Sequence, residues 1–561
     1  MLRITWLLLA GLAIPVWAIA ELPTCSAPAW STCDLIFELS PDEDTTRTEL
    51  RVEFRSPHRD TLAIQGFRQA PGRWVVRVAP TSAGEWDYRI TTSVDLLDGR
   101  VGHMTATESD APGFVQTALS HHFQTQGNLL QHLWMGAEVG DFSQLPVEDF
   151  TDILKVRRAE GFTHLQVVIE TDTDLDAAAE RIRAINDQGF VADLVLPVPE
   201  GSRRQGERQV AELVARFCAF NITWAGIPAF ETIPEELGDG WELAREVSEV
   251  IAANDPYHHP LTSQAQTTSA SLLGDPNDPE VPMTMVSYGT VDPNIGAVEH
   301  QFYHLPALNT AIASRADLWN ATMNGQYPAS STEGPGAAQE MRAWADLMGE
   351  ARYWNLEPYF DLDGGRALAY PALEYIVYVQ EPGPVELHVE KHGYDVLWMD
   401  PATGERIEAK GFNEDVFSTE PPPGDHDWVL RVSREGKKKD LLNDLKFDAL
   451  VPPVQEVETR ASETPYEIVS PTENLSLRIA NFYELKVTRG SRATRDLLVE
   501  WTAELATGRG GFRVVGTGQS GQLQLPKILT EQGPGVLSLR VQLLNAYGKA
   551  YFVDRAVRLT E

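Results

Sequence analysis

Residues 147–170 read VEDFTDILKVRRAEGFTHLQVVIE. Apolar residues first recur at helical spacing up to Gly161, and the segment THLQVVIE that follows is a short apolar run typical of a strand. The same order returns in residues 175–197 (LDAAAERIRAINDQGFVADLVLP), 207–227 (ERQVAELVARFCAFNITWAGI) and 241–265. Four consecutive helix-then-strand units with continuous apolar strands predict a parallel sheet whose two faces are both covered.

The span that holds these units, residues 119–375, has the ~250 residues of an eight-stranded β/α barrel. An open doubly wound sheet is the competing fold, but no glycine-rich phosphate fingerprint follows the first strand of the sequence. We therefore expect a multidomain chain built around a (β/α)8 TIM barrel.

Strand patterns flank the expected barrel on both sides. Residues 21–118, with the alternating runs TELRVEFRS and GRWVVRVAPTSAGEWDYRI, predict an N-terminal β-sandwich. Residues 376–435, with a turn built on Pro and Gly inside DVLWMDPATGERI, predict a second β-sandwich. Residues 436–462 form a charged linker, and residues 463–561 have the pattern of an Ig-like β-sandwich without its disulfide.

The N-terminus predicts export. Residues 1–20 combine a positive start, the apolar run WLLLAGLAIPVWA and a small-residue cleavage site, which is typical of a signal peptide and of a secreted or periplasmic protein. No later apolar stretch approaches the ~20 residues of a membrane span. Cys25 and Cys33 could pair in an oxidising compartment, whereas Cys218 lies in an apolar helical stretch and is expected to be a buried thiol.

The net charge of −35 argues against a nucleic-acid partner, because phosphate binding needs basic surface. We expect no cofactor and no metal. His258 and His259 lack a third ligand at suitable spacing and are more simply structural, and DLDGG at residues 361–365 is better explained as a turn than as a calcium loop.

In a β/α barrel, functional side chains gather where strands end. The expected strand ends carry carboxylates, amides and aromatic residues, a set that suits carbohydrate because aromatic faces stack on sugar rings while carboxylates and amides bind hydroxyl groups. Any one of these aromatic residues could instead belong to the core. The candidates are Trp134, Glu138, Trp224, Glu231, Tyr288, Asn309, Thr310, Gln326 and Tyr327.

Several motifs together resemble bacterial apiosidase-like glycoside hydrolases, over roughly residues 40–435. They are PGRWVVRVAPTSAGEWDYRI, LLQHLWMGAE, NITWAGIPAFE, RADLWNATMNGQYP and WMDPATGERIEA. The resemblance implies an N-terminal domain of unknown function, a barrel and a C-terminal sandwich, with an acid/base glutamate that corresponds to Glu231. It also implies a nucleophilic glutamate directly after Asn309, where this chain has Thr310.

The missing glutamate leaves two functions open. Glycoside cleavage typically uses two carboxyl groups, ~5 to 9.5 Å apart, and threonine cannot supply the negative charge of one of them. Either Glu138 serves together with Glu231 in a rearranged hydrolase, or the chain is a noncatalytic glycan-binding protein on a degenerate barrel.

Overall fold

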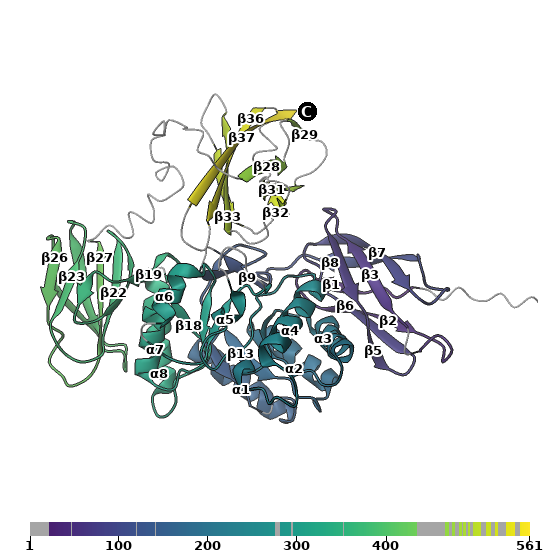
Figure 1. Cartoon of the computed structure of the whole chain (residues 1–561), viewed down its shortest axis with the longest axis horizontal. Helices are drawn as coiled ribbons and strands as arrows, with labels where there is room; N and C mark the ends of the chain where they lie inside the picture. Colours follow the sequence, from purple (N-terminus) through teal and green to yellow (C-terminus); the bar gives the residue numbers. More distant parts are fainter. Residues whose placement is uncertain are drawn as a thin grey trace, which may run out of the picture.

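The computed structural model describes residues 22–434, apart from residues 46–47, 119–120, 141, 275–280, 293–294 and 352, and the strands between residues 466 and 560. Figure 1 shows a β-rich N-terminal part, a central part of helices and strands, and a second β-rich part. The predicted signal peptide (1–20) and linker (436–462) lie outside the described residues. Within the described chain, no helix is both long and apolar enough to cross a membrane.

The N-terminal part packs a five-stranded sheet against a three-stranded sheet. Alternation in LRVEFR buries every second residue, so this strand contributes one apolar face to the core. A disulfide joins Cys25 to Cys33, as the sequence allowed. The first sheet runs β1 (Ser26–Pro28), β8 (Val101–Thr107), β7 (Gly84–Thr92), β3 (Leu50–Arg55), β4 (Thr61–Gln65), and the second runs β2 (Cys33–Glu38), β6 (Arg73–Val78), β5 (Phe67–Ala70).

A small antiparallel sheet connects this part to the centre. Its middle strand is buried along its whole length, and Phe123 packs against both Trp134 and Tyr327. The strands are β9 (Val115–Ala118), β10 (His122–Thr125) and β11 (Gln131–His132).

The central part opens with four parallel strands in chain order, and the predicted helices lie between them. Gly161 ends the first helix at φ 94°, a left-handed conformation that glycine adopts without strain, and Asp174 caps the next helix through its side chain. The strands are β12 (Gly136–Glu138), β13 (His164–Val168), β14 (Val191–Val195) and β15 (Ile222–Gly226). The helices are α1 (Val147–Glu160), α2 (Leu175–Asp187), α3 (Arg203–Phe217) and α4 (Gly240–Asn254), with the 3-10 turn η1 (Phe230–Thr232) before α4.

A second parallel sheet of three strands follows: β16 (Val286–Tyr288), β17 (Ala307–Asn309) and β18 (Gln326–Pro328). Its helical elements are α5 (Ala270–Leu273), α6 (Ile295–Phe302), α7 (Arg315–Met323), α8 (Ala337–Glu350) and η2 (Tyr353–Asn355). The strand pairings within both central sheets are all parallel, as the sequence predicted.

The two parallel sheets meet at both edges. Leu261 forms a parallel bridge with Trp224 of β15, and its carbonyl oxygen accepts hydrogen bonds from the backbone N–H groups of Thr284 and Met285, just before β16. At the other junction, a Cβ on Gly136 of β12 would clash with the carbonyl oxygen of Ala329, one residue beyond β18. The glycine therefore permits close backbone contact between the first and last parallel strands.

The C-terminal sandwich begins at residue 357, earlier than the expected boundary at 376, because three short strands before that boundary join its sheets. Its larger sheet runs β19 (Glu357–Tyr359), β21 (Arg366–Tyr370), β22 (Glu374–Val379), β27 (Trp428–Arg434), β24 (Tyr394–Met399), β25 (Arg406–Phe412). The smaller sheet runs β20 (Leu362–Asp363), β23 (Val385–His388), β26 (Val416–Thr419). Arg315 of α7 ties this sandwich to the central part, because it binds Asp427 at 2.7 Å.

The described strands beyond residue 465 form three further sheets. One contains β29 (Asn474–Ser476), β37 (Ala550–Thr560), β36 (Gly535–Leu544), β33 (Leu498–Ala506) and β34 (Phe512–Thr517). The other two contain β28 (Tyr466–Ser470), β31 (Lys486–Arg489) and β32 (Arg492–Ala493), and β30 (Phe482–Glu484) with β35 (Gln522–Gln524).

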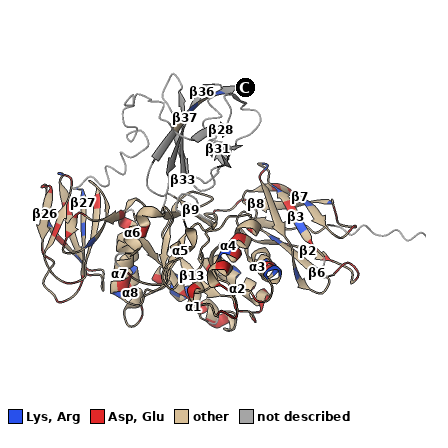
Figure 2. Cartoon of the chain, viewed as in Figure 1, with Lys and Arg blue, Asp and Glu red and all other residues tan. Residues whose placement is uncertain are grey.

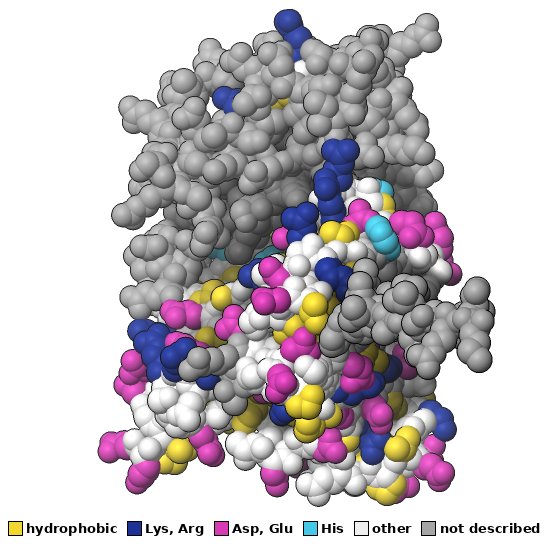
Figure 3. All heavy atoms as spheres, turned by 90° about the vertical axis from the view of Figure 1, so that its right-hand side faces the viewer, with side chains coloured by type: hydrophobic (Ala, Val, Ile, Leu, Met, Phe, Trp, Pro, Cys, Tyr) yellow, Lys and Arg dark blue, Asp and Glu magenta, His cyan; other side chains and the backbone are white. Residues whose placement is uncertain are grey.

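The acidic charge is distributed over the described chain. Figure 2 shows acidic residues on helices and strands of all three parts. On the face drawn in Figure 3, acidic, basic and apolar side chains are interspersed. This arrangement fits an acidic, solubilising exterior.

Candidate functional site

A row of four polar side chains crosses the four-stranded parallel sheet. Glu138 of β12 pairs in register with Gln166 of β13, Gln166 with Asp193 of β14, and Asp193 with Thr223 of β15. Residues in register on neighbouring strands project from the same face of a sheet, so the four side chains form one continuous row, here called the polar row. Hydrogen bonds link its three buried members: the Gln166 amide donates to Asp193 Oδ2 (2.9 Å) and the Thr223 hydroxyl to Asp193 Oδ1 (2.7 Å).

Burial gives Asp193 unusual acid–base properties. The residue is 2% exposed. Burial raises the pKa of its carboxyl group to about 6, although the hydrogen bonds from Gln166 and Thr223 act in the opposite direction. Asp193 therefore exchanges a proton near neutral pH, a property common at functional sites.

Glu138 lies at the exposed end of the polar row. It is the last residue of β12, and its side chain is exposed while Gln166 beside it is buried. Two strand spacings separate Glu138 from Asp193, about 9.6 Å between backbones. The row thus combines a solvent-accessible carboxylate with a buried carboxyl group that can hold a proton, and such contrasting pairs are suited to acid–base chemistry.

Glu231 lies in η1, in the loop that follows β15. Its two carboxylate oxygens accept hydrogen bonds from the backbone N–H groups of Gln266 (2.8 Å) and Thr267 (3.1 Å). These bonds fix the orientation of the carboxylate and join two loops at the carboxyl side of the sheet. The side chain remains partly exposed.

An aromatic residue that the sequence analysis missed packs against Phe230, the residue before Glu231. Trp241, at the start of α4, is 41% exposed, and its ring packs edge-on against Phe230 with 5.3 Å between centroids. A Cβ on Gly240 would clash with the carbonyl oxygen of Phe230, so glycine allows α4 to begin against η1. The signal in the sequence was the pair Gly240–Trp241 directly after an acidic loop.

Thr310 follows β17, and the hydrogen bond that the structure shows for its hydroxyl group involves a backbone carbonyl oxygen and no carboxylate. Its backbone N–H and its hydroxyl both donate to the carbonyl oxygen of Tyr288, at 2.8 and 3.1 Å. Strand alternation places its side chain on the face of Leu308, opposite to that of Asn309.

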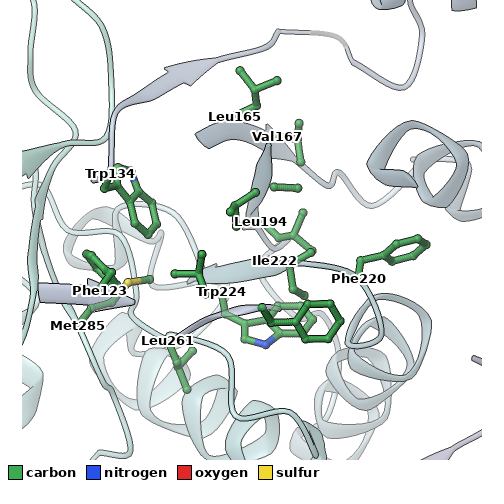
Figure 4. Packing of buried hydrophobic residues seen from close by; sticks show 14 of the residues in the cluster. Phe123, Trp134, Leu165, Val167, Leu194, Phe220, Ile222, Trp224, Leu261 and Met285 are labelled. Atoms are coloured by element: carbon green, nitrogen blue, oxygen red, sulfur yellow. The ribbon is translucent and has the colours of Figure 1, made fainter. Parts of the chain in front are cut away.

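The two tryptophans predicted to contact sugar are core residues. Trp134 is wholly buried, precedes β12, and stacks on His164 with 3.5 Å between ring centroids. It therefore lies toward the amino ends of the strands, below the polar row. Trp224 is also wholly buried, projects from the opposite face of the sheet and donates its Nε1–H to Asp255 (2.9 Å) at the end of α4. Figure 4 shows both indoles among buried hydrophobic residues of the core.

Three more residues predicted to contact sugar, Tyr288, Asn309 and Gln326, face the helical layer instead of a cleft. Tyr288 is 3% exposed and donates to Glu299 of α6 at 2.7 Å. Asn309 is wholly buried and donates to Gln326 at 2.9 Å. These strands are three residues long, too short for the residue pattern to set the phase of their alternation, and tertiary packing turned these side chains toward the helices.

Tyr327 is buried as well, and its hydroxyl group contacts Nδ1 of His122 in the small antiparallel sheet.

Of the nine predicted site residues, Glu138, Glu231 and Thr310 keep some exposure. Gln166 and Asp193 were missed, although each is a polar residue at the third position of an apolar strand.

Three residues also form a cluster suited to a metal ion. Ligand atoms of His121, His300 and Glu357 all lie within 4.8 Å of one another. Burial lowers the pKa of His300 to about 4, and the nearby histidines lower the pKa of Glu357 even though burial alone would raise it. His259, by contrast, pairs with Asp255 at 2.9 Å within the core, in the structural role expected for it.

Comparison with known proteins finds one matching family model and several similar solved structures. Residues 26–93 match DUF5060, a domain of unknown function. No curated protein matches the chain. A "putative glycoside hydrolase" from Bacteroides vulgatus is similar, with 16% identity and a TM-score of 0.60, over 73% of this chain and 100% of that chain.

Two further structures are less similar. A glycoside hydrolase of family 5 from Bacteroides vulgatus has 14% identity and a TM-score of 0.47, over 58% of this chain and 95% of its own. A family 39 glycoside hydrolase from Bacteroides cellulosilyticus has 11% identity and a TM-score of 0.37, over 74% of this chain and 100% of its own. At these identities, what the first structure shares with this chain is the fold.

Proposed function

We propose that this chain is a glycoside hydrolase-like protein that acts on polysaccharide or oligosaccharide. The seven strands of the parallel sheets and the segment around Leu261 would together close into an eight-stranded β/α barrel. The bridge from Leu261 to Trp224 and the contact of Gly136 with Ala329 support this closure. The fold shared with the "putative glycoside hydrolase" of Bacteroides vulgatus points the same way.

The polar row carries the proposal. It places an exposed carboxylate, Glu138, beside a hydrogen-bonded chain of Gln166, Asp193 and Thr223, in which the Asp193 carboxyl group can hold a proton. A sugar bound over the row would contact Glu138 directly, while Asp193 acts through Gln166 as a positioning residue. Glu231 corresponds to the acid/base glutamate in the apiosidase-like resemblance and would approach the bound sugar from the neighbouring loop. The exposed ring of Trp241 would be available for stacking on a sugar ring.

A noncatalytic glycan-binding protein is the second candidate. The resemblance to apiosidase-like enzymes implies a nucleophilic glutamate at position 310. This chain has Thr310 there, and its hydroxyl donates to a backbone carbonyl oxygen. Burial of the four predicted sugar-stacking aromatics also removes support for a broad aromatic cleft.

The two candidates are separated by assaying aryl glycosides and oligosaccharides with the wild type, Glu138→Gln, Glu231→Gln and the control Glu235→Gln, an exposed glutamate of the same loop. For the hydrolase, we expect measurable turnover that falls at least about 100-fold in both site variants, the scale of general acid–base catalysis, and persists in the control. Turnover that survives Glu138→Gln and Glu231→Gln would contradict the assigned carboxylates.

For the glycan-binding protein, we expect saturable binding without turnover in calorimetry with the same oligosaccharides. Thr310→Glu would then introduce a carboxylate, and the appearance of hydrolysis would support a degenerate site. Neither turnover nor binding across a broad glycan panel would contradict both candidates.

Export to a secreted or periplasmic location is part of the proposal. It is supported by residues 1–20 and by the Cys25–Cys33 disulfide, since disulfides persist in oxidising compartments. The mass of the mature chain recovered from a bacterial host tests it, because removal of the leader would leave a chain that begins near residue 21.

A further inference from the structure

His121, His300 and Glu357, here called the His–His–Glu cluster, come from three separate elements. His121 directly precedes β10 of the small antiparallel sheet, His300 lies in α6, and Glu357 begins β19 of the C-terminal sandwich. In sequence, His121 and Glu357 are 236 residues apart. The cluster therefore joins three elements that contribute to different sheets and layers.

The donor atoms converge on one point. His121 Nδ1 lies 3.2 Å from one oxygen of Glu357, and His300 Nε2 is in contact with the other oxygen. The two imidazole rings stack with 3.6 Å between centroids and 25° between planes. Ligands of a tetrahedral Zn²⁺ ion, bound at about 2.0–2.2 Å, lie roughly 3.3 Å apart, close to the separation of His121 and Glu357.

The hydrogen bond on the far side of His121 fixes its tautomer. Nε2 lies 3.1 Å from the backbone carbonyl oxygen of His300. A carbonyl oxygen only accepts, so Nε2 must carry the hydrogen. In a neutral ring, Nδ1 then presents its lone pair toward a carboxylate oxygen, and two acceptors that face each other need a cation between them. Metal-binding histidines commonly have this arrangement, with the second ring nitrogen bound to a carbonyl group.

Access and burial also suit an ion. His121 and His300 are 5% and 7% exposed, so their rings are held in place by packing. The Glu357 side chain is 48% exposed, which leaves one side of the cluster open to solvent. An ion can enter from this side, and water can complete its coordination.

We propose that the His–His–Glu cluster binds one divalent transition-metal ion of the Zn²⁺ class. The ion ties the small antiparallel sheet and α6 to the first strand of the C-terminal sandwich. Two imidazole nitrogens and one carboxylate form a borderline-soft donor set that suits Zn²⁺ or Co²⁺ better than Ca²⁺ or Mg²⁺, which prefer oxygen ligands.

The test uses the full chain after treatment with a chelator and removal of that chelator. Zn²⁺ is titrated in competition with a chromophoric chelator, and Co²⁺ is followed by visible absorption. We expect one equivalent of either ion per chain, intense tetrahedral-type Co²⁺ bands, and a rise of the melting temperature on addition of Zn²⁺. Binding should fall at least about tenfold in His121→Gln, His300→Gln and Glu357→Gln, the scale on which lost coordination weakens a site.

The matched control is His388→Gln. His388 and Glu386 form an exposed His–Glu pair at 3.5 Å, so this variant removes a similar pair from another part of the chain. It should bind Zn²⁺ as the wild type does. The Glu357→Gln variant provides a site change at a half-exposed position if a histidine variant fails to fold.

The alternative is a proton-held cluster in which a charged imidazole replaces the metal ion. In that case the wild type would take up no stoichiometric Zn²⁺ or Co²⁺ at micromolar concentration, and the proposal would be overturned. Equal Zn²⁺ binding by the wild type and all three site variants would overturn it as well.

Discussion

The charge of Asp193 is predicted to destabilise the protein at neutral pH. The carboxyl group is buried at 2% exposure, and its pKa is raised from 3.8 to about 6. Because the folded state binds this proton more tightly than the unfolded chain, the stability that the proton contributes is fully present below the unfolded pKa. It is lost as the pH rises through about 6.

The magnitude follows from the size of the shift. A difference of about two pKa units corresponds to about 3 kcal/mol, of which about 2 kcal/mol develops between about pH 4 and pH 7.5. Asp193→Asn retains the shape of the side chain but cannot ionise. The stability of the variant relative to the wild type should therefore increase by about 2 kcal/mol over that pH interval.

Urea unfolding followed by tryptophan fluorescence, at several pH values between about 4 and 8, measures this difference. Comparison of variant with wild type cancels the other titrating groups. Asp187→Asn, the same replacement at an exposed residue of α2, is the control for the effect of exchanging Asp for Asn as such. A pH-independent difference for Asp193→Asn, or one that decreases toward neutral pH, would refute the reasoning.

Three further predictions concern contacts near the candidate site and between the parts. Glu231→Gln leaves one of two backbone N–H groups without an acceptor and should lower the free energy of unfolding, measured in urea titrations, by about 1–2 kcal/mol. An unchanged value would show that these two hydrogen bonds do not hold the loop in solution. Gly240→Ala should lower the free energy of unfolding by about 1–3 kcal/mol, because the new Cβ meets the carbonyl oxygen of the residue before Glu231. In the control Gly349→Ala, in α8, the new Cβ meets no atom within 4 Å, so this variant should be as stable as the wild type or more stable. Thermal melts that rank the two variants in the opposite order would contradict the packing. Arg315→Met leaves Asp427, which is 8% exposed, with the Tyr378 hydroxyl but without its cationic partner, and should lower stability by about 3–5 kcal/mol in the same melts. Recovery in the double variant with Asp427→Leu would confirm that the uncompensated charge is the cause.

The helices of the central part could be predicted from local chemistry. Gly161 and Gly189 follow α1 and α2 with φ of 94° and 81°, as the apolar periodicity and the glycines indicated. Asp174 caps α2 and Ser202 caps α3, each through hydrogen bonds with the first turn of its helix. These features depend on residues a few positions apart, so sequence alone contains them.

The candidate site could be predicted only in part. Glu138 and Glu231 lie at accessible positions, but Trp134 and Trp224 are buried, and Tyr288 faces α6. A strand end can be recognised from composition, whereas the direction of a side chain on a three-residue strand depends on which neighbours pack against it.

The sequence by itself determined the alternation of helices and strands in the central part and the period-two pattern of strands such as LRVEFR, because these depend on periodicity, and it allowed the Cys25–Cys33 pair through short spacing. Tertiary structure decided the polar row, in which Asp193 meets Gln166 and Thr223 through strand register. It also decided the His–His–Glu cluster, in which residues up to 236 positions apart converge. Register and long-range convergence arise from the packing of whole elements, and no local window of sequence encodes the distances that result.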